Sequence, residues 1–207
     1  MSQYLGIDVL DIKIHNRSEP LDEAVRRSFA LIDSETGKRK PDERTAAPNP
    51  ARPFHWTCFS RAEVNAMQTF LDARRGMAVP FWLPSYQQDL SLNEAAVETE
   101  TILTIDHVRY AQLMFPNTGA RRHIAIYARG QAMFFRKIVD AQDPVDNTTE
   151  SVTVDSGLPR DLPIDTTVIS FLKLCRLDED GWTISWLSGH TADTVIRVRE
   201  VPKEAPQ

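Results

Sequence analysis

Residues 167–201 read TVISFLKLCRLDEDGWTISWLSGHTADTVIRVREV, and this stretch decides the fold class. Two runs rich in β-branched and apolar residues, 167–177 and 181–187, flank the turn sequence Asp178-Glu-Asp-Gly181. Within it, the Asp-Gly pair favours a type I′ hairpin turn. A last run, 194–201, alternates apolar residues with arginines, as a half-buried strand does. The stretch therefore predicts a β-hairpin followed by one more strand.

Runs of the same period-two character precede this stretch. They predict strands at 10–14, 28–32, 101–105, 123–127, 132–139 and 151–154, separated by Asn, Gly, Pro and Asp. Many short strands at such spacing indicate a mainly β fold, an antiparallel β-sandwich or barrel-like domain. We expect a single domain over residues 1–207, which ends in a polar tail at 202–207.

One segment departs from this pattern and predicts an amphipathic helix over about 61–75, packed on the β-domain. Ser60 and Glu63 have the spacing of a capping box, in which each side chain binds a backbone N–H of the first turn. Basic residues at the end of the segment suit the negative end of the helix dipole, and Gly76 is placed to end the helix. The apolar stripe of this helix consists of Val64, Met67, Phe70 and Leu71.

Prolines set the character of the segment at about 38–53, which holds Pro41, Pro48, Pro50 and Pro53. Because proline cannot donate to a sheet ladder, we expect an extended, exposed loop here. The loop is either an arm that orders against a neighbouring subunit or a simple solvated connection. We take Pro41, Pro48 and Pro50 as candidate inter-subunit residues.

Aromatic residues flank the expected helix on both sides. The preferred interpretation is that they share one core with the helix, with Trp and Tyr using their polar edges. The alternative places Trp82 or Tyr86 on the surface, where a sugar would stack on the ring. The aromatic residues concerned are Phe54, Trp56, Phe59, Phe81, Trp82 and Tyr86.

Composition and motifs give no support for catalysis. The net charge of −5 argues against a nucleic-acid-binding surface, which needs a basic footprint. The sequence contains neither a phosphate-binding glycine cluster nor a Gly-x-Ser-x-Gly elbow, and its five histidines lie far apart. We therefore expect no enzyme activity, no cofactor and no metal. Cys58 and Cys175 are expected to be buried free thiols.

No apolar run reaches the length of about 18 residues that a membrane-spanning helix needs, so we expect no membrane insertion. The first residues lack the basic and apolar regions of a signal peptide. We expect the protein to be made and assembled in the cytoplasm.

The segment 61–90, Arg61-Ala-Glu-Val-Asn-Ala-Met-Gln-Thr-Phe-Leu-Asp-Ala-Arg-Arg-Gly-Met-Ala-Val-Pro-Phe-Trp-Leu-Pro-Ser-Tyr-Gln-Gln-Asp-Leu90, resembles a unit of distal tail proteins. These proteins occur in long-tailed bacteriophages and in gene transfer agents. In them a helix that ends in Phe-x-x-Ala-Arg-x-Gly leads to an aromatic strand and then to an acidic residue. The matching positions are Phe70, Leu71, Ala73, Arg74, Arg75, Gly76, Phe81, Trp82, Pro84 and Asp89.

The resemblance implies a structural protein of the virion, located at the tail tip. Such proteins form a ring, usually a hexamer, that joins the tail tube to the hub and to the receptor-binding apparatus. It implies as partners further copies of the chain, the tube protein, the hub and the tape-measure protein. Two alternatives stay open: another tail assembly or completion protein, and a carbohydrate-binding β-sandwich module of a tail fibre. The candidate inter-subunit or packing residues in this segment are Phe70, Arg74, Arg75, Phe81, Trp82, Tyr86 and Asp89.

Overall fold

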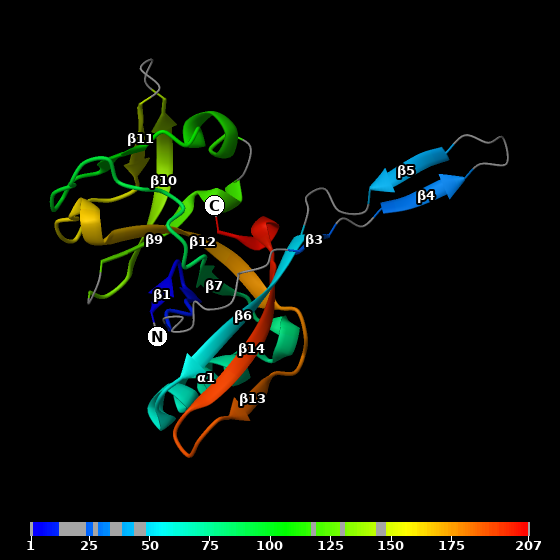
Figure 1. Ribbon diagram of the computed structural model, residues 1–207. Coiled ribbons are helices and arrows are strands. Elements are labelled where there is room, and N and C mark those ends of the chain that lie inside the picture. Colours follow the sequence, from blue (N-terminus) through cyan, green and yellow to red (C-terminus); the bar gives the residue numbers. More distant parts are fainter. Residues whose placement is uncertain are drawn as a thin grey trace. The chain divides into compact units, whose positions relative to one another are not determined.

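The computed structural model describes residues 2–12, 24–26, 29–33, 39–43, 49–116, 119–128, 131–143 and 148–206. Within these ranges the fold is mainly β with antiparallel strand pairs, and it contains one α-helix, α1 (Arg61–Arg74) (Figure 1). The predicted fold class, a mainly β, sandwich-like fold with one packed amphipathic helix, is confirmed.

The chain divides into two compact units. Unit 1 comprises residues 1–13, 81–174 and 202–207, and unit 2 comprises residues 14–80 and 175–201. Strand β12 (Thr167–Leu177) contributes to both, since the division falls between Leu174 and Cys175. Contacts within the chain thus define two compact units, and whether residues 1–207 fold as the predicted single domain stays a prediction.

Unit 1 is built on one antiparallel sheet and a short hairpin. In sheet order, the strands are β8 (Ile102–Asp106), β11 (Thr149–Val154), β10 (Phe134–Gln142), β9 (His123–Ala128) and β12, with β7 (Phe81–Pro84) also paired to β12. The hairpin consists of β1 (Gln3–Tyr4) and β2 (Ile7–Asp8). Apolar side chains of these strands and of the segment before β8 fill one core, which includes Leu90, Leu103, Ile124, Val152 and Ile169.

Unit 2 is organised around β14 (Ala192–Glu200). Strand β6 (Asn49–Cys58) pairs with almost the whole length of β14, and β3 (Ala24–Arg26) pairs with the start of β6. The other edge of β14 pairs with β13 (Thr183–Trp186) and with the end of β12. Strands β4 (Phe29–Asp33) and β5 (Arg39–Glu43) form a separate two-stranded sheet.

The predicted hairpin between 167–177 and 181–187 is wrong in its pairing. Strand β13 pairs with residues 192–195 of β14, and the end of β12 pairs with residues 198–200. The two strands therefore follow each other along one edge of β14. The connection between the two strands, residues 178–182, is longer than the two-residue loop of a type I′ hairpin. At its start, the N–H of Asp178 binds the carbonyl of Arg197 on β14 (2.9 Å) and not a residue of β13.

The extended loop predicted at about 38–53 is also corrected, because it contains β5 and the first residues of β6. Prolines are compatible with strands at an edge or near a strand's first residue, where no partner needs the missing N–H. Pro41 lies in a two-stranded sheet, in which each strand has an open edge, and Pro50 is the second residue of β6. Pro48 lies outside the described residues.

The strand predicted at 10–14 is wrong for the residues that the structure describes, since Leu10 to Ile12 lie in no strand. The N–H of Leu10 binds the carbonyl of Trp82 (2.9 Å), and its own carbonyl accepts the hydroxyl of Tyr86 (2.6 Å). The segment therefore meets β7 at one isolated bridge, between Val9 and Trp82, and forms no continuous ladder with it. The other predicted strands are confirmed, with bounds that differ from the prediction by at most three residues.

Helix α1 is confirmed to within one residue. Its N-cap is Ser60, whose hydroxyl accepts the N–H of Glu63 (3.2 Å). The carboxylate of Glu63 accepts the N–H of Phe59 (2.8 Å), one residue before the cap. The predicted stripe is buried in full, at Val64, Met67, Phe70 and Leu71.

Candidate functional site

The end of α1 brings together two residues of the resembling segment. Arg74 is only 3% exposed, and its guanidinium stacks over the ring of Phe70, 4.6 Å from the ring centre. Its Nη1 donates to the carbonyl of Pro80 (3.2 Å). Arg74 therefore holds the chain that leaves the helix, in addition to compensating the helix dipole.

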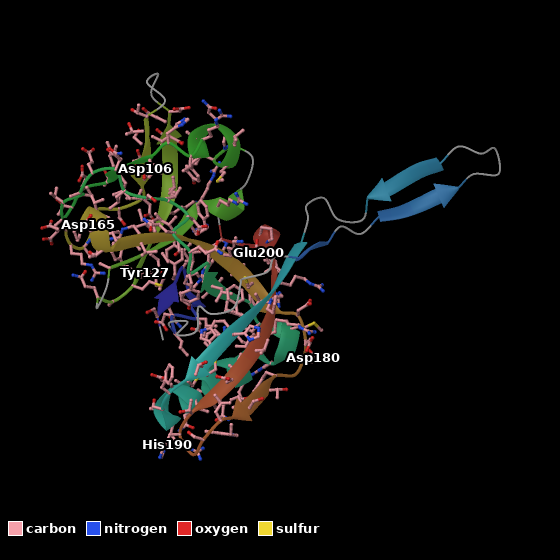
Figure 2. The ribbon with its side chains drawn as sticks, in the orientation of Figure 1. Asp106, Tyr127, Asp165, Asp180, His190 and Glu200 are labelled. Atoms are coloured by element: carbon pink, nitrogen blue, oxygen red, sulfur yellow. The ribbon has the colours of Figure 1, made fainter. Side chains whose placement is uncertain are left out.

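The turn after α1 contains two successive residues with left-handed backbone. Arg75 has φ 51° and Gly76 has φ 62°. The N–H of Arg75 binds the carbonyl of Asp72 (3.1 Å) and closes the helix. Gly76 lies against the loop 178–182, whose Asp180 accepts the N–H of Met77 (3.2 Å) (Figure 2). The helix therefore ends at Arg75, one residue before the predicted Gly76, and both residues adopt the left-handed conformation.

The aromatic residues after the helix lie in the core of unit 1. Phe81 and Trp82 are at most 1% exposed, and Tyr86 is 8% exposed. The indole Nε1 of Trp82 donates to the carbonyl of Tyr4 (3.1 Å). Burial raises the pKa of Tyr86, whose hydroxyl remains a donor to the carbonyls of Leu10 and Ile12. The predicted burial of these three rings is confirmed, whereas Phe59, before the helix, is 57% exposed. Since the three rings belong to unit 1 and α1 to unit 2, a core shared with the helix stays a prediction.

Asp89 binds backbone rather than solvent. Its Oδ2 accepts the N–H of Phe171 (2.7 Å) and the hydroxyl of Ser85. The N–H groups of Asp89 and Leu90 in turn bind the carbonyl of Ile169. Asp89 thus fixes the chain after β7 to β12. The candidate residues of segment 61–90 thus make contacts within this chain. An inter-subunit role for them, or for Pro41, Pro48 and Pro50, stays a prediction.

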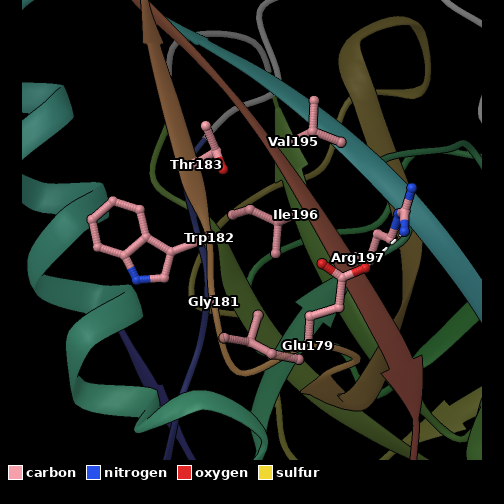
Figure 3. A pocket seen from close by; sticks show the side chains of 8 residues that line it. Glu179, Gly181, Trp182, Thr183, Val195, Ile196 and Arg197 are labelled. Carbon is pink, nitrogen blue, oxygen red and sulfur yellow. Dashed lines mark hydrogen bonds and ion pairs between the residues drawn. The ribbon is translucent and has the colours of Figure 1, made fainter.

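A cleft of about 420 Å³ opens in unit 2 where β12 and β13 succeed each other along β14 (Figure 3). Its lining includes an exposed ion pair between Arg197 Nη1 and Glu179 Oε1 (2.7 Å). A second pair, between Arg199 and Asp178, anchors the start of the loop. The cleft combines apolar walls with one exposed charge pair, so it suits a ligand or side chain with both apolar and polar parts. Its lining residues are Leu177, Glu179, Gly181, Trp182, Thr183, Val195, Ile196 and Arg197.

A buried cluster in unit 1 gathers Tyr4, Trp82 and His123. The rings of Trp82 and His123 lie 4.8 Å apart, and Tyr4 Oη shares a hydrogen bond of 3.1 Å with His123 Nδ1. Burial and the charge of Lys137 lower the pKa of His123 from 6.5 to about 4. The carboxylate of Asp155 and a backbone hydrogen bond with Pro206 act in the opposite direction. His123 is therefore neutral at pH 7.

This cluster predicts an acid-sensitive fold. The folded-state pKa of His123 lies below the unfolded value, so protonation favours the unfolded chain, and stability is lost as pH falls from 6.5 towards 4. We expect about 2 kcal/mol of the free energy of unfolding to disappear between pH 7 and pH 5. Urea unfolding at a series of pH values measures it. The His123→Gln variant should lose most of this slope, and an unchanged slope would contradict the assignment.

Glu150 is a residue that sequence reasoning missed. It lies on β11, is fully buried (0% exposed), and accepts three backbone N–H groups: Val108 (2.7 Å), Tyr110 (3.1 Å) and Ala111 (2.7 Å). Two of these N–H groups, those of Tyr110 and Ala111, begin a π-helical turn, Tyr110–Met114, and the third belongs to the residue before Arg109, which has left-handed conformation. The carboxylate thus caps the turn, much as an acidic side chain caps an α-helix. The only sequence signal for its burial is the period-two pattern of β11, which places Glu150 on the same face as Val152 and Val154.

The described residues offer no evident place for a metal. Among them, no three His, Cys, Asp or Glu side chains gather closely enough to hold an ion. Cys58 and Cys175 are buried and form no disulfide, as expected, and burial raises the pKa of the Cys58 thiol. In the part of the chain that the structure describes, no helix has the length and apolar character required to cross a membrane.

Comparison with protein-family models and with curated proteins finds no match to the sequence.

Proposed function

We propose that this chain is a structural, non-enzymatic virion protein of a long-tailed bacteriophage. It forms a ring at the distal end of the tail, a hexamer as the resemblance implies. The ring connects the tail tube to the hub and the receptor-binding apparatus. Each interface in such a ring is heterologous, and rotation closes it.

The observation that supports this proposal best is the use of the resembling segment within the fold. Arg74 and Phe70 secure the end of α1, Phe81 and Trp82 fill a core, and Asp89 binds the backbone of β12. These residues hold the chain in place and leave little of the motif for chemistry. A shared motif with such roles fits a scaffold protein better than an enzyme.

The β4–β5 hairpin supports the assembly part of the proposal. It forms its own two-stranded sheet, Phe29–Asp33 with Arg39–Glu43. An isolated two-stranded hairpin is marginally stable in water, and packing on further structure stabilises it. A neighbouring copy in a ring supplies such a surface, so this hairpin takes the place of the proline-rich loop as the candidate inter-subunit arm.

The carbohydrate-binding alternative changes its candidate residue. Trp82 and Tyr86 are buried, so neither ring is open to a sugar. The cleft in unit 2 has an aromatic residue, Trp182, and the Glu179–Arg197 pair among its lining residues, and both kinds of group occur in such sites. In this alternative, the chain would be located on tail fibres rather than at the end of the tube.

Location on the particle tests the proposal. We expect a gold-labelled antibody against the chain to bind only the tail tip of purified phage particles in negative-stain micrographs. An antibody against the tube protein, used in parallel, should label the tail along its length and so control for access. Label along the fibres would favour the carbohydrate-binding alternative. Particles free of label, with the chain absent from their protein composition, would overturn both.

A further inference from the structure

A second hollow, in unit 1, has a basic character that the proposed function does not use. It has a volume of about 650 Å³, within the size range of pockets that hold ligands. Its lining combines the side chains of Arg122, His123 and Lys137 with three residues, Pro202, Ala205 and Pro206, of the segment 202–206, which we call the C-terminal strap. The strap begins with a 3-10 turn, Pro202–Glu204, in the stretch expected to be a polar tail. We call this hollow the strap groove.

Lys137 supplies the main charge of the strap groove. Lys137 and His123 are directly opposite each other on β10 and β9, so their side chains lie on the same face of the sheet. The carboxylate of Asp155 accepts the backbone N–H of Lys137 (3.1 Å). Among the described residues, no ion pair or hydrogen bond engages the Lys137 ammonium.

Arg122 adds a second cation with spare donors. Its guanidinium stacks over the ring of Phe115, 4.5 Å from the ring centre, and Nη2 donates to the Phe115 carbonyl (3.2 Å). Its Nε is buried and has no hydrogen-bond partner within the described part of the chain. A buried donor without a partner costs free energy, which a bound acceptor recovers.

We propose that the strap groove binds an acidic peptide segment of a partner protein, with a carboxylate placed between Lys137 and Arg122. The described residues that line the groove include two cations and no carboxylate, although the whole chain has a net charge of −5. Such a local reversal of charge attracts an anionic group and orients it. The inference follows from the groove alone and does not depend on the proposed function.

The chemistry of the groove favours a peptide carboxylate over a nucleic acid or a free phosphate. A nucleic acid would have to approach an acidic protein that carries only a small basic area. A phosphate dianion gains most from several converging donors, whereas one ammonium and a partly engaged guanidinium suit a single negative charge. Pro202, Ala205 and Pro206 give the strap an apolar surface on which a peptide's aliphatic groups pack.

NMR titration of the full chain tests this proposal. The probe is an acetylated and amidated Ala-Ala-Glu-Ala-Ala peptide, and the matching Gln peptide and inorganic phosphate serve as comparisons. We expect the Glu peptide to shift the amide signals of residues 119–123, 137 and 202–206. The Gln peptide and phosphate should leave these signals in place at the same concentration.

Variants of two half-buried strand lysines provide the control. Lys137→Ala should weaken binding of the Glu peptide about fivefold or more, since one charge pair is lost. Lys137→Arg should retain it, and Lys173→Ala, on β12 and outside the lining, should bind as the unchanged chain does. Amide spectra verify that each variant is folded. Equal binding of the Gln peptide, tighter binding of phosphate, or no shift with any probe would overturn the proposal.

Discussion

Replacing Glu150 by alanine is expected to lower the free energy of unfolding by about 3–5 kcal/mol. The substitution leaves the N–H groups of Val108, Tyr110 and Ala111 without their acceptor in a site that excludes water. Each unsatisfied buried N–H costs about 1–3 kcal/mol, and local rearrangement recovers part of the sum. Urea unfolding measures the total. Hydrogen exchange of these three amides, which should become fast, shows where the structure is lost.

Two further substitutions sharpen this test. Glu150→Gln keeps the shape and one carbonyl oxygen, so its loss of stability should lie between those of the alanine variant and the unchanged chain. Glu98→Ala removes an exposed carboxylate from the same unit, and we expect a change within about 0.5 kcal/mol. A loss below about 1 kcal/mol for Glu150→Ala would mean that water or another group replaces the carboxylate.

Replacing Gly76 by alanine is expected to cost about 3 kcal/mol in the free energy of unfolding. The backbone at Gly76 has φ 62°, which an L-residue adopts at a cost of about 1–2 kcal/mol. The added Cβ would also lie 2.9 Å from the Cα of Asp180, a backbone atom that yields only if the whole loop 178–182 moves. Thermal and urea unfolding of the variant provide the measurement.

Two other glycines separate these causes. Gly6 has φ 75° and open space around its Cα, so Gly6→Ala should show the conformational cost alone. Gly157 has no such φ, but an added Cβ would lie 2.7 Å from the carbonyl oxygen of Thr99, so Gly157→Ala should show the steric cost alone. If Gly76→Ala costs no more than Gly6→Ala, loop 178–182 does not press on the end of α1.

Local signals in the sequence predicted local structure well. The Ser60 cap and the stripe from Val64 to Leu71 placed α1 to within one residue, because helix contacts are three or four residues apart. Alternation placed most strands, because burial on one face leaves a period of two in the sequence. The aromatic run around Trp82 was correctly assigned to a core.

Pairing and polar burial were beyond these signals. Strand β13 pairs with β14 rather than with β12, since each candidate partner offers the same kind of alternating face. Pro41 and Pro50 were assigned to a loop, because the sequence does not say which side of a strand is open. The roles of Glu150 and His123 depend on backbone N–H groups and aromatic rings from segments that are distant in the sequence, so neither role could be read from the local pattern.

The interleaved course of the chain has a consequence for protein synthesis. Unit 1 requires residues 81–174, yet it also includes 202–206, which leave the ribosome only after residues 175–201 of unit 2. Neither unit is one uninterrupted piece of chain, so neither can be completed while the other is unmade. Contacts between distant residues slow folding. Because unit 1 is completed last, it stays unfinished for longest in the nascent chain, and during that period a chaperone has most to protect.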